Sequence, residues 1–140
     1  MNKMMFPAIV AAAGMVVAAA NVSFAAQSEQ PGSGFQPKPY FEMPLERDPT
    51  RQVRVQNVVI PPGASNKFHR HPGDQWWMVQ EGEVVFQVKG QPAKTLHPGD
   101  YVYVPRGTVH RNANMSDKPV RSIELNITDR GVPQTEQVPD

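Results

Sequence analysis

The sequence predicts an all-β fold: a single antiparallel jelly-roll β-barrel domain. From residue 51 onward, short β-branched and aromatic segments alternate with Pro- and Gly-containing turns about every 6 to 12 residues. Beyond residue 26, no stretch repeats apolar residues with the 3.6-residue period of an amphipathic helix. The 140 residues suffice for one domain, and without cysteine its core must be stable without disulfides.

We expect eight strands in this barrel, each ending at a turn signal. The first ends at Pro61-Pro62-Gly63, and the fourth carries an apolar residue at every second position from Val84 to Val88. Pro98-Gly99-Asp100 and Pro105-Arg106-Gly107 separate later strands. The expected ranges are 51–60, 67–71, 75–80, 83–89, 94–96, 101–104, 108–112 and 120–127.

Residues 1–25 have the composition of a secretory signal peptide. Lys3 provides a basic start, residues 4–20 are almost entirely apolar, and Ser23-Phe24-Ala25 offers small residues to a signal peptidase. A twin arginine is lacking, so we expect Sec-type export to the bacterial periplasm or the medium, with no membrane attachment after cleavage. The alternative is a retained anchor, for which about 17 apolar residues is the short limit.

Three further segments follow the signal peptide: an arm (26–50), the barrel (51–128) and a polar tail (129–140). Prolines and glycines interrupt the arm, which predicts a loop without regular structure. Its apolar residues would pack on the barrel or on a partner in a homodimer, which we expect. These residues are Tyr40, Phe41, Met43 and Leu45.

The charge balance excludes two classes of partner. Without the signal peptide the chain carries 13 basic and 13 acidic residues. No basic stripe remains to bind nucleic acid or an anionic membrane surface. A small-molecule ligand is therefore the expected partner.

Three of the four histidines have a spacing that suits metal binding. His69 and His71 lie two residues apart on an expected strand, so their side chains point to the same face. His110 comes from a distant strand, and neutral imidazole is the commonest metal ligand of this type. A lone histidine is more often a hydrogen-bonded core residue, but three at these spacings predict a metal site. His97, next to a turn, is expected to be exposed and without a role.

Two segments around these histidines carry fixed spacings. Residues 63–82 follow G-x5-H-x-H-x3/4-E-x6-G except that Gln75 replaces the glutamate, and residues 99–114 follow G-x5-P-x-G-x2-H-x3-N at every fixed position. Both resemble the motifs of the small single-domain cupins of the conserved-barrel type. The resemblance implies that His69, His71 and His110 bind one divalent transition metal ion, with Gln75 at the fourth position.

Gln75 changes the chemistry that the resemblance implies. A neutral ligand leaves the ion its full charge, which strengthens it as a Lewis acid, but the amide oxygen also holds it less tightly. Glutamine cannot act as a general base. Two arrangements stay open, one in which Gln75 binds the ion and one in which only the histidines do. The ion's identity is also open among Zn, Mn, Fe, Ni and Cu.

Alternation also predicts which residues lie near the ion. Trp77 shares the face of Gln75, and Thr108 and Asn112 share that of His110, so these three are candidates for the wall of a substrate pocket. Packing in the core is the alternative for Trp77. Tyr101 and Tyr103 share one face and are the candidates for a catalytic acid or base.

Three functions are compatible with this pattern. The first is a metal-dependent enzyme of oxygenase, isomerase or lyase type that acts on a small organic molecule, because three or four protein ligands leave positions open for water or substrate. The second is a module that binds a metal or small ligand without converting it. The third is a pocket that binds no metal.

Overall fold

The fold is seen in a computed structural model that describes residues 34–139. The expected signal peptide and the first residues of the arm lie outside this range. None of the described residues belongs to a helix that is long and apolar enough to cross a membrane. The strands are β1 (Gln36–Pro44), β2 (Arg51–Ile60), β3 (His69–Arg70), β4 (Asp74–Glu81), β5 (Val84–Val88), β6 (Lys94–Leu96), β7 (Tyr101–Val104), β8 (His110–Ala113), β9 (Val120–Asp129) and β10 (Glu136–Gln137).

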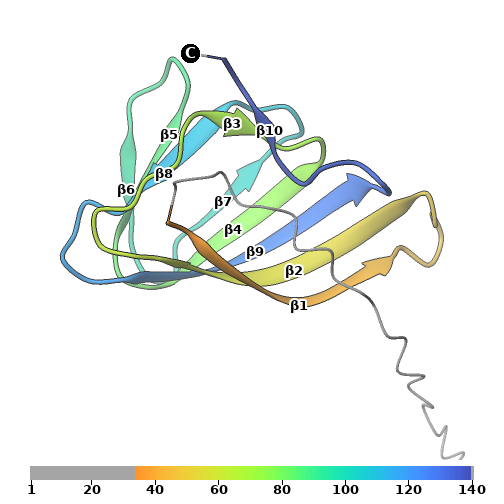
Figure 1. The fold of residues 1–140 in the computed structure, drawn as a ribbon, viewed down its shortest axis with the longest axis horizontal. Helices are drawn as coiled ribbons and strands as arrows, with labels where there is room; N and C mark the ends of the chain where they lie inside the picture. The colour runs from red at the N-terminus through yellow and green to blue at the C-terminus, as the bar shows by residue number, and fades with distance from the viewer. Residues whose placement is uncertain (1–33, 140) are drawn as a thin grey trace, which may run out of the picture.

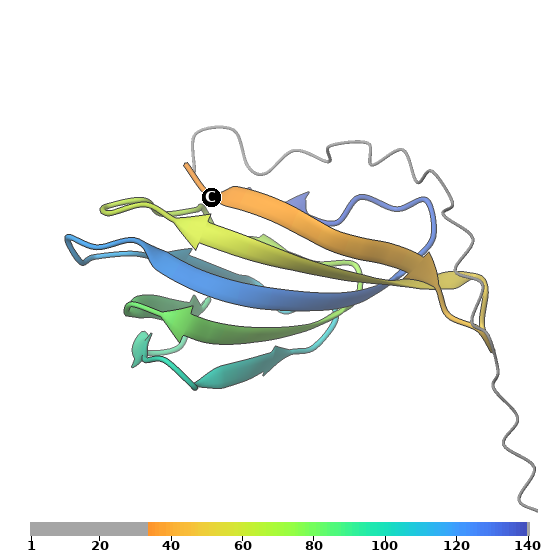
Figure 2. The ribbon, with the colours of Figure 1, turned by 90° about the horizontal axis from the view of Figure 1, so that it is seen from below.

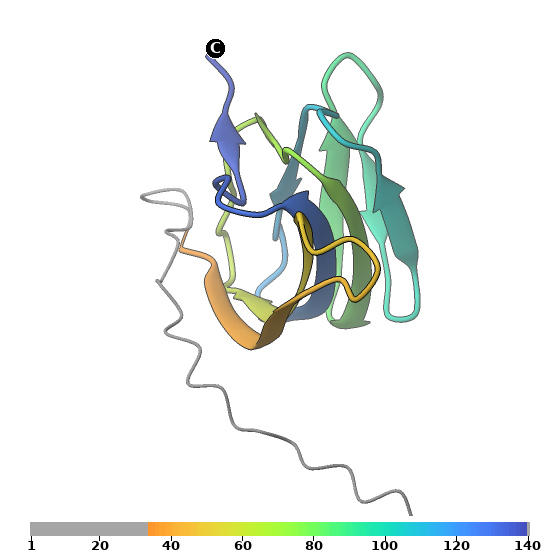
Figure 3. The same cartoon turned by 90° about the vertical axis from the view of Figure 1, so that its right-hand side faces the viewer.

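These strands form two antiparallel sheets, which confirms the expected all-β jelly roll (Figure 1). The first sheet has the order β1-β2-β9-β4-β7, and its strands lie side by side in Figure 2. The second has the order β10-β3-β8-β5-β6. The sheets curve around a common interior, which Figure 3 shows from one end. Several neighbouring strands, such as β2 and β9 or β3 and β8, are distant in sequence, so residues from several segments meet inside.

The expected loop conformation of the arm is wrong over Gln36–Pro44, which forms the edge strand β1. This strand pairs with β2 from Gln36 opposite Val59 to Pro44 opposite Gln52, with a bulge between Pro39 and Phe41. Proline lacks an N–H and is tolerated on an edge strand, because one side of such a strand makes no ladder hydrogen bonds. Composition alone therefore does not distinguish this strand from a loop.

Two other differences lie near the histidines. The strand expected over residues 67–71 is shorter, because β3 ends at Arg70 and His71 follows it directly. The polar tail contains β10, which pairs with β3 and places Glu136 opposite Arg70. The side chains of this pair form a salt bridge of 2.7 Å on the exposed face. The tail therefore closes the edge of the sheet that carries His69.

The apolar core and the polar interior occupy different parts of the barrel. On β2 the inward residues change from Ile60 and Val58, which are apolar, to Gln56, and all three are buried. Glu124 of β9 is the strand partner of Gln56. The inside is thus packed with hydrocarbon at one end and lined with polar groups further along. The apolar cluster contains Val58, Ile60, Trp77, Val79, Val84, Phe86, Leu96, Val102, Val104 and Val120.

Gly73 allows the segment between His71 and Gln75 to lie against β9. A Cβ atom at this position would lie 2.1 Å from the carbonyl oxygen of Ile127, a distance that no side chain tolerates. Only glycine permits this contact of backbone with backbone. The contact sets where β4 begins and therefore where Gln75 lies.

Asn114, the last residue of the second motif, holds a turn and is completely buried. Its side-chain Nδ2 donates to the carbonyl oxygens of Ile60, Pro61 and Lys118 at 2.9, 3.2 and 2.7 Å. Its Oδ1 accepts from the amide and the hydroxyl of Ser116. The motif asparagine is therefore structural.

Replacing Asn114 by alanine should destabilise the fold and leave the histidine site intact. The substitution removes a buried donor from three carbonyl groups, so the free energy of unfolding should fall by about 2–3 kcal/mol. Urea unfolding measures the change. Met115→Ala, at the neighbouring exposed position, is the matched control and should change little. Equal stability of the Asn114→Ala and wild-type proteins would contradict this assignment.

Candidate metal centre

His69, His71 and His110 meet in the interior of the barrel. His69 on β3 and His110 on β8 are direct strand partners, and His71 follows β3. Their ring centroids lie 4.4 to 5.2 Å apart, and each residue is at most 5 % exposed. One nitrogen from each ring lies within 4.8 Å of the other two. A single ion can therefore contact all three.

Backbone carbonyl groups fix the orientation and tautomer of these three rings. The Nδ1 atoms of His69, His71 and His110 lie 2.9, 2.8 and 3.0 Å from the carbonyl oxygens of Lys67, Gln134 and Thr108. A carbonyl oxygen only accepts, so each Nδ1 carries the proton and each Nε2 keeps a free lone pair.

The unprotonated Nε2 atoms indicate what the site can bind. Nε2 of His71 and Nε2 of His110 are buried and have no hydrogen-bond partner among residues 34–139. A buried polar atom without a partner is costly, and a metal ion would satisfy it. A ligating histidine usually donates its other ring N–H to a carbonyl or carboxylate, as all three rings do here. The residues present thus fit a metal ion.

Burial keeps the three imidazoles neutral. Loss of solvation lowers the pKa of His69, and lowers that of His71 to about 4 and that of His110 to about 3. Repulsion from a charged His69 lowers the last two further, against the hydrogen bonds to the backbone. Neutral rings at neutral pH are the form that binds metal.

Gln75 faces the interior from the opposite sheet, as the alternation along β4 predicts. It is 3 % exposed, and its strand partners are Asn126 of β9 and Val104 of β7. Trp76 and Met78 lie on the outer face and are 39 % and 40 % exposed. Gln75 is the candidate ligand that comes from the first sheet.

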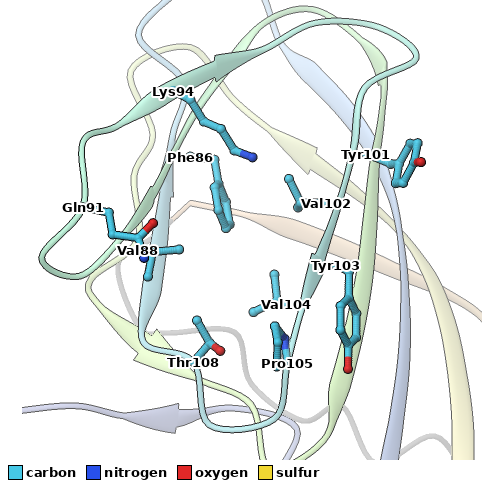
Figure 4. Close-up of a pocket in the computed structure, with 10 residues that line it drawn as sticks. All are labelled: Phe86, Val88, Gln91, Lys94, Tyr101, Val102, Tyr103, Val104, Pro105 and Thr108. Atoms are coloured by element: carbon cyan, nitrogen blue, oxygen red, sulfur yellow. The ribbon is translucent and has the colours of Figure 1, made fainter.

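A hollow of about 450 Å³ lies beside the histidines, between β7 and the segment of β5 and β6 (Figure 4). Phe86 and Thr108 belong to its wall. The Phe86 ring lies 5.6 Å from that of His110, and the Thr108 carbonyl accepts the hydrogen bond from His110 Nδ1. None of the three histidines is among the residues that line the hollow, but two residues of its wall neighbour His110, and its volume suffices for a small organic molecule.

The candidate pocket residues have three different positions. Thr108 lines the hollow. Trp77 belongs to the apolar cluster, and its N–H donates to the hydroxyl of Ser122 at 2.9 Å, so it packs in the core and does not line the hollow. Asn112 is buried next to Phe86, and its Oδ1 has no hydrogen-bond partner.

Tyr101 and Tyr103, the candidate catalytic residues, line the hollow at its exposed side, together with the buried Val102 and Val104 (Figure 4). The two tyrosines are 75 % and 52 % exposed. The Tyr103 hydroxyl donates to Asp74 Oδ1 at 3.0 Å, and this hydrogen bond raises the pKa of Tyr103. Alternation correctly placed both on one face, but it is the outer one.

Glu124 is a buried polar residue that the motifs do not contain. It lies on the inner face of β9, and its Oε2 accepts a hydrogen bond of 2.8 Å from Gln56 Nε2. The sequence signal was the polar series Ser122, Glu124, Asn126 and Thr128 at alternate positions. Such a series usually marks the solvent side of a strand, but here it lines the interior.

The comparisons with known proteins agree with this fold. The family model for the cupin domain matches residues 56–126. A cupin-like protein from Thermotoga maritima is 29 % identical, with a TM-score of 0.62 over 74 % of this chain and 75 % of that one. An oxalate oxidase in complex with the substrate analogue glycolate is 20 % identical and similar in fold alone, with a TM-score of 0.58 over 76 % of this chain and 56 % of that one.

The curated relatives match over shorter segments. Dimethylsulfoniopropionate lyase DddQ of Ruegeria pomeroyi is 34 % identical over 68 residues, which are 49 % of this chain and 33 % of the lyase. Across the curated relatives that match, the aligned part is between 33 % and 49 % of their length. This chain therefore matches less than half the length of each of these curated relatives.

The metal-free protein should lose stability as the pH falls from about 6.5 toward 4. In this window the histidines of the unfolded chain are protonated, whereas His71 and His110 stay neutral in the fold, so the unfolded state binds more protons. The free energy of unfolding should fall by about 1.4 kcal/mol per pH unit for each such histidine.

Urea unfolding with a chelator present, at a series of pH values, measures this slope. His110→Gln should have a shallower slope, and His97→Ala, which removes an exposed histidine, should keep that of the wild-type protein. The same slope in the His110→Gln and wild-type proteins would contradict the assignment.

Proposed function

The chain belongs to the cupin family, and we propose that it is an exported cupin that binds a divalent transition metal ion and acts on a small organic molecule. The observation that supports this most strongly is the set of three buried imidazoles with Nδ1 bound to backbone carbonyls. Their Nε2 atoms are the proposed ligands, with Gln75 as the fourth.

The bound ion would act as a Lewis acid toward an oxygen of the ligand or toward water. The protein would contribute neutral ligands, so the site would keep the full charge of the ion and attract an anionic or polarisable oxygen. The hollow beside His110 would give a small molecule access, with Thr108 and Phe86 on its wall. Loading after export favours zinc or copper over iron, because they bind such ligands more tightly.

A metal-dependent reaction of oxygenase, isomerase or lyase type is the favoured activity. Its support is the hollow whose wall neighbours His110 and the relation to a lyase of similar sequence. Binding without conversion is the second candidate, favoured by the outward position of Tyr101 and Tyr103. If the protein is a metal-dependent enzyme, its conversion of the substrate should be lost in His71→Ala and kept in His97→Ala.

Replacement of one proposed ligand should release the metal. His71→Ala should lower the affinity for zinc at least about 100-fold, because loss of a residue that only supports a ligand already costs 10- to 100-fold. Calorimetric titration and elemental analysis of protein purified from the periplasmic fraction measure affinity and occupancy. His97→Ala is the matched control, since His97 is exposed and pairs with Glu83. Full zinc occupancy in His71→Ala would contradict the proposal.

We further propose that the protein is a homodimer that pairs through the outer face of the first sheet. The alternation on β9 turns Ile123, Leu125 and Ile127 outward, next to Trp76 and Met78 of β4. An apolar face with exposed tryptophan and methionine is typical of an interface between subunits. The balance of 13 basic and 13 acidic residues after the expected signal peptide gives no support to a nucleic-acid partner.

The mass in solution tests this assembly. The wild-type protein should have twice the mass of one chain by light scattering. Met78→Asp should reduce the mass to that of one chain, because it buries a charge at the proposed interface. Met115→Asp is the control at an exposed position in a different loop and should stay dimeric. A monomeric wild-type protein would contradict the proposal.

A further inference from the structure

The inner face of β9 carries a carboxyl group that the histidine site does not use. Ser122, Glu124 and Asn126 are buried on this face. Glu124 is the most accessible of the three, with 9 % of its surface exposed against 0 % and 1 %. Glu124 is therefore the least enclosed of the three.

No cation neutralises Glu124. Among residues 34–139 it forms no salt bridge, and its hydrogen-bond partner is the neutral Gln56. Burial raises the pKa of Glu124, whereas the amides of Gln56 and Asn126 lower it. A buried carboxyl is costly, and a residue kept only for packing would be apolar.

Next to this carboxyl lies the amide of Asn126, close enough to lower the pKa of Glu124. Among residues 34–139, neither its Nδ2 nor its Oδ1 makes a hydrogen bond of ordinary geometry, although both atoms are buried. Oδ1 of Asn112, on the facing sheet, also makes none within this range. These atoms are one donor group and two acceptors. A ligand with hydroxyl and oxygen groups would satisfy them.

The strand register places Glu124 close to the proposed metal ligands. Asn126 is the partner of Gln75, and Glu124 is the partner of the next inward residue of β4, Trp77. Glu124 and Gln75 are thus diagonal neighbours on one face, about 7–8 Å apart along the backbone and within reach of long side chains. The carboxyl therefore lies on the wall next to the metal site and outside the set of proposed ligands.

The other charged or titratable groups of this interior are few. From the facing sheet come His69, His71 and His110, which burial keeps neutral. From β2 comes Arg54, the partner of Asn126, which is held by Glu42 and Gln134. Within the described residues, Glu124 is thus the carboxyl that can exchange a proton with a molecule in this space.

We infer that Glu124 is the acid–base residue of the barrel interior, for a small oxygen-rich ligand that has a hydroxyl group next to a second oxygen. The inference rests on the proposed metal site. Glu124 takes up the proton when the ligand's O–H bond breaks, and the electron pair stays on the ligand oxygen, whose charge a bound metal ion would stabilise. No oxidant or reductant takes part. Gln56 holds the carboxyl in place, and Asn126 and Asn112 contact the rest of the ligand.

The test counts the protons released when acetohydroxamate, a small ligand with this pair of oxygens, binds to the zinc-loaded protein. Calorimetry at neutral pH in buffers of different ionisation enthalpy gives this number. Glu124→Gln keeps the size and the hydrogen bond to Gln56 but accepts no proton. It should release about one more proton per ligand than the wild-type protein. Thr128→Val, on the same face of β9, is the matched control and should behave as wild type.

The outcomes separate this inference from the proposed metal site. Failure of the wild-type protein to hold zinc overturns the metal site. Zinc and acetohydroxamate binding with equal proton release in the Glu124→Gln and wild-type proteins overturns the role of Glu124 alone. Failure of zinc-loaded wild-type protein to bind acetohydroxamate also overturns it, since no open position would then face the carboxyl.

A second measurement needs no variant. Infrared spectra of the zinc-loaded wild-type protein should gain the absorption of a neutral carboxyl group when acetohydroxamate binds. If that absorption does not increase, Glu124 does not accept the proton, whatever the variant does.

Discussion

The chemistry of this barrel depends on three hydrogen bonds from imidazole N–H groups to backbone carbonyls. They come from three different segments, at Lys67, Thr108 and Gln134. Each bond fixes a tautomer and turns an unprotonated Nε2 into the interior. Burial keeps the rings neutral, and the free energy lost by the unpaired nitrogens would be recovered when an ion binds. The site is therefore pre-organised by the backbone, and the fold carries the cost of the metal-free state.

A second constraint is the alternation along β9, which is the reverse of that in an ordinary half-buried strand. Its polar residues, such as Glu124, face the interior, and its apolar residues, such as Leu125, face outward. Unpaired polar groups in the interior support the proposed ligand, and apolar residues on the outer face support the proposed partner. One alternating strand thus connects the proposed small-molecule site with the proposed dimer. The apolar end of the barrel, around Ile60 and Val120, maintains the fold while the other end stays polar.

Turn signals and strand alternation were sufficient to predict the jelly roll and the ranges of β2, β6 and β7, and the histidine spacing predicted that three histidines meet. These features depend on local turns and on strand alternation. Alternation does not tell which face is inside, so the outward position of Tyr103 and the inward position of Glu124 required the structure. Likewise β1 and β10 form at the edges of the sheets, where β2 and β3 offer them a partner, and composition does not reveal this pairing.

The most direct test of this account is the tautomer of each buried histidine, measured by long-range ¹H–¹⁵N NMR of the metal-free protein at neutral pH. The account predicts that His69, His71 and His110 each have a protonated Nδ1 and an unprotonated Nε2. It also predicts that the Nε2 signals, and not the Nδ1 signals, shift when zinc is added. Protonated Nε2 atoms, or zinc-induced shifts at Nδ1, would contradict it.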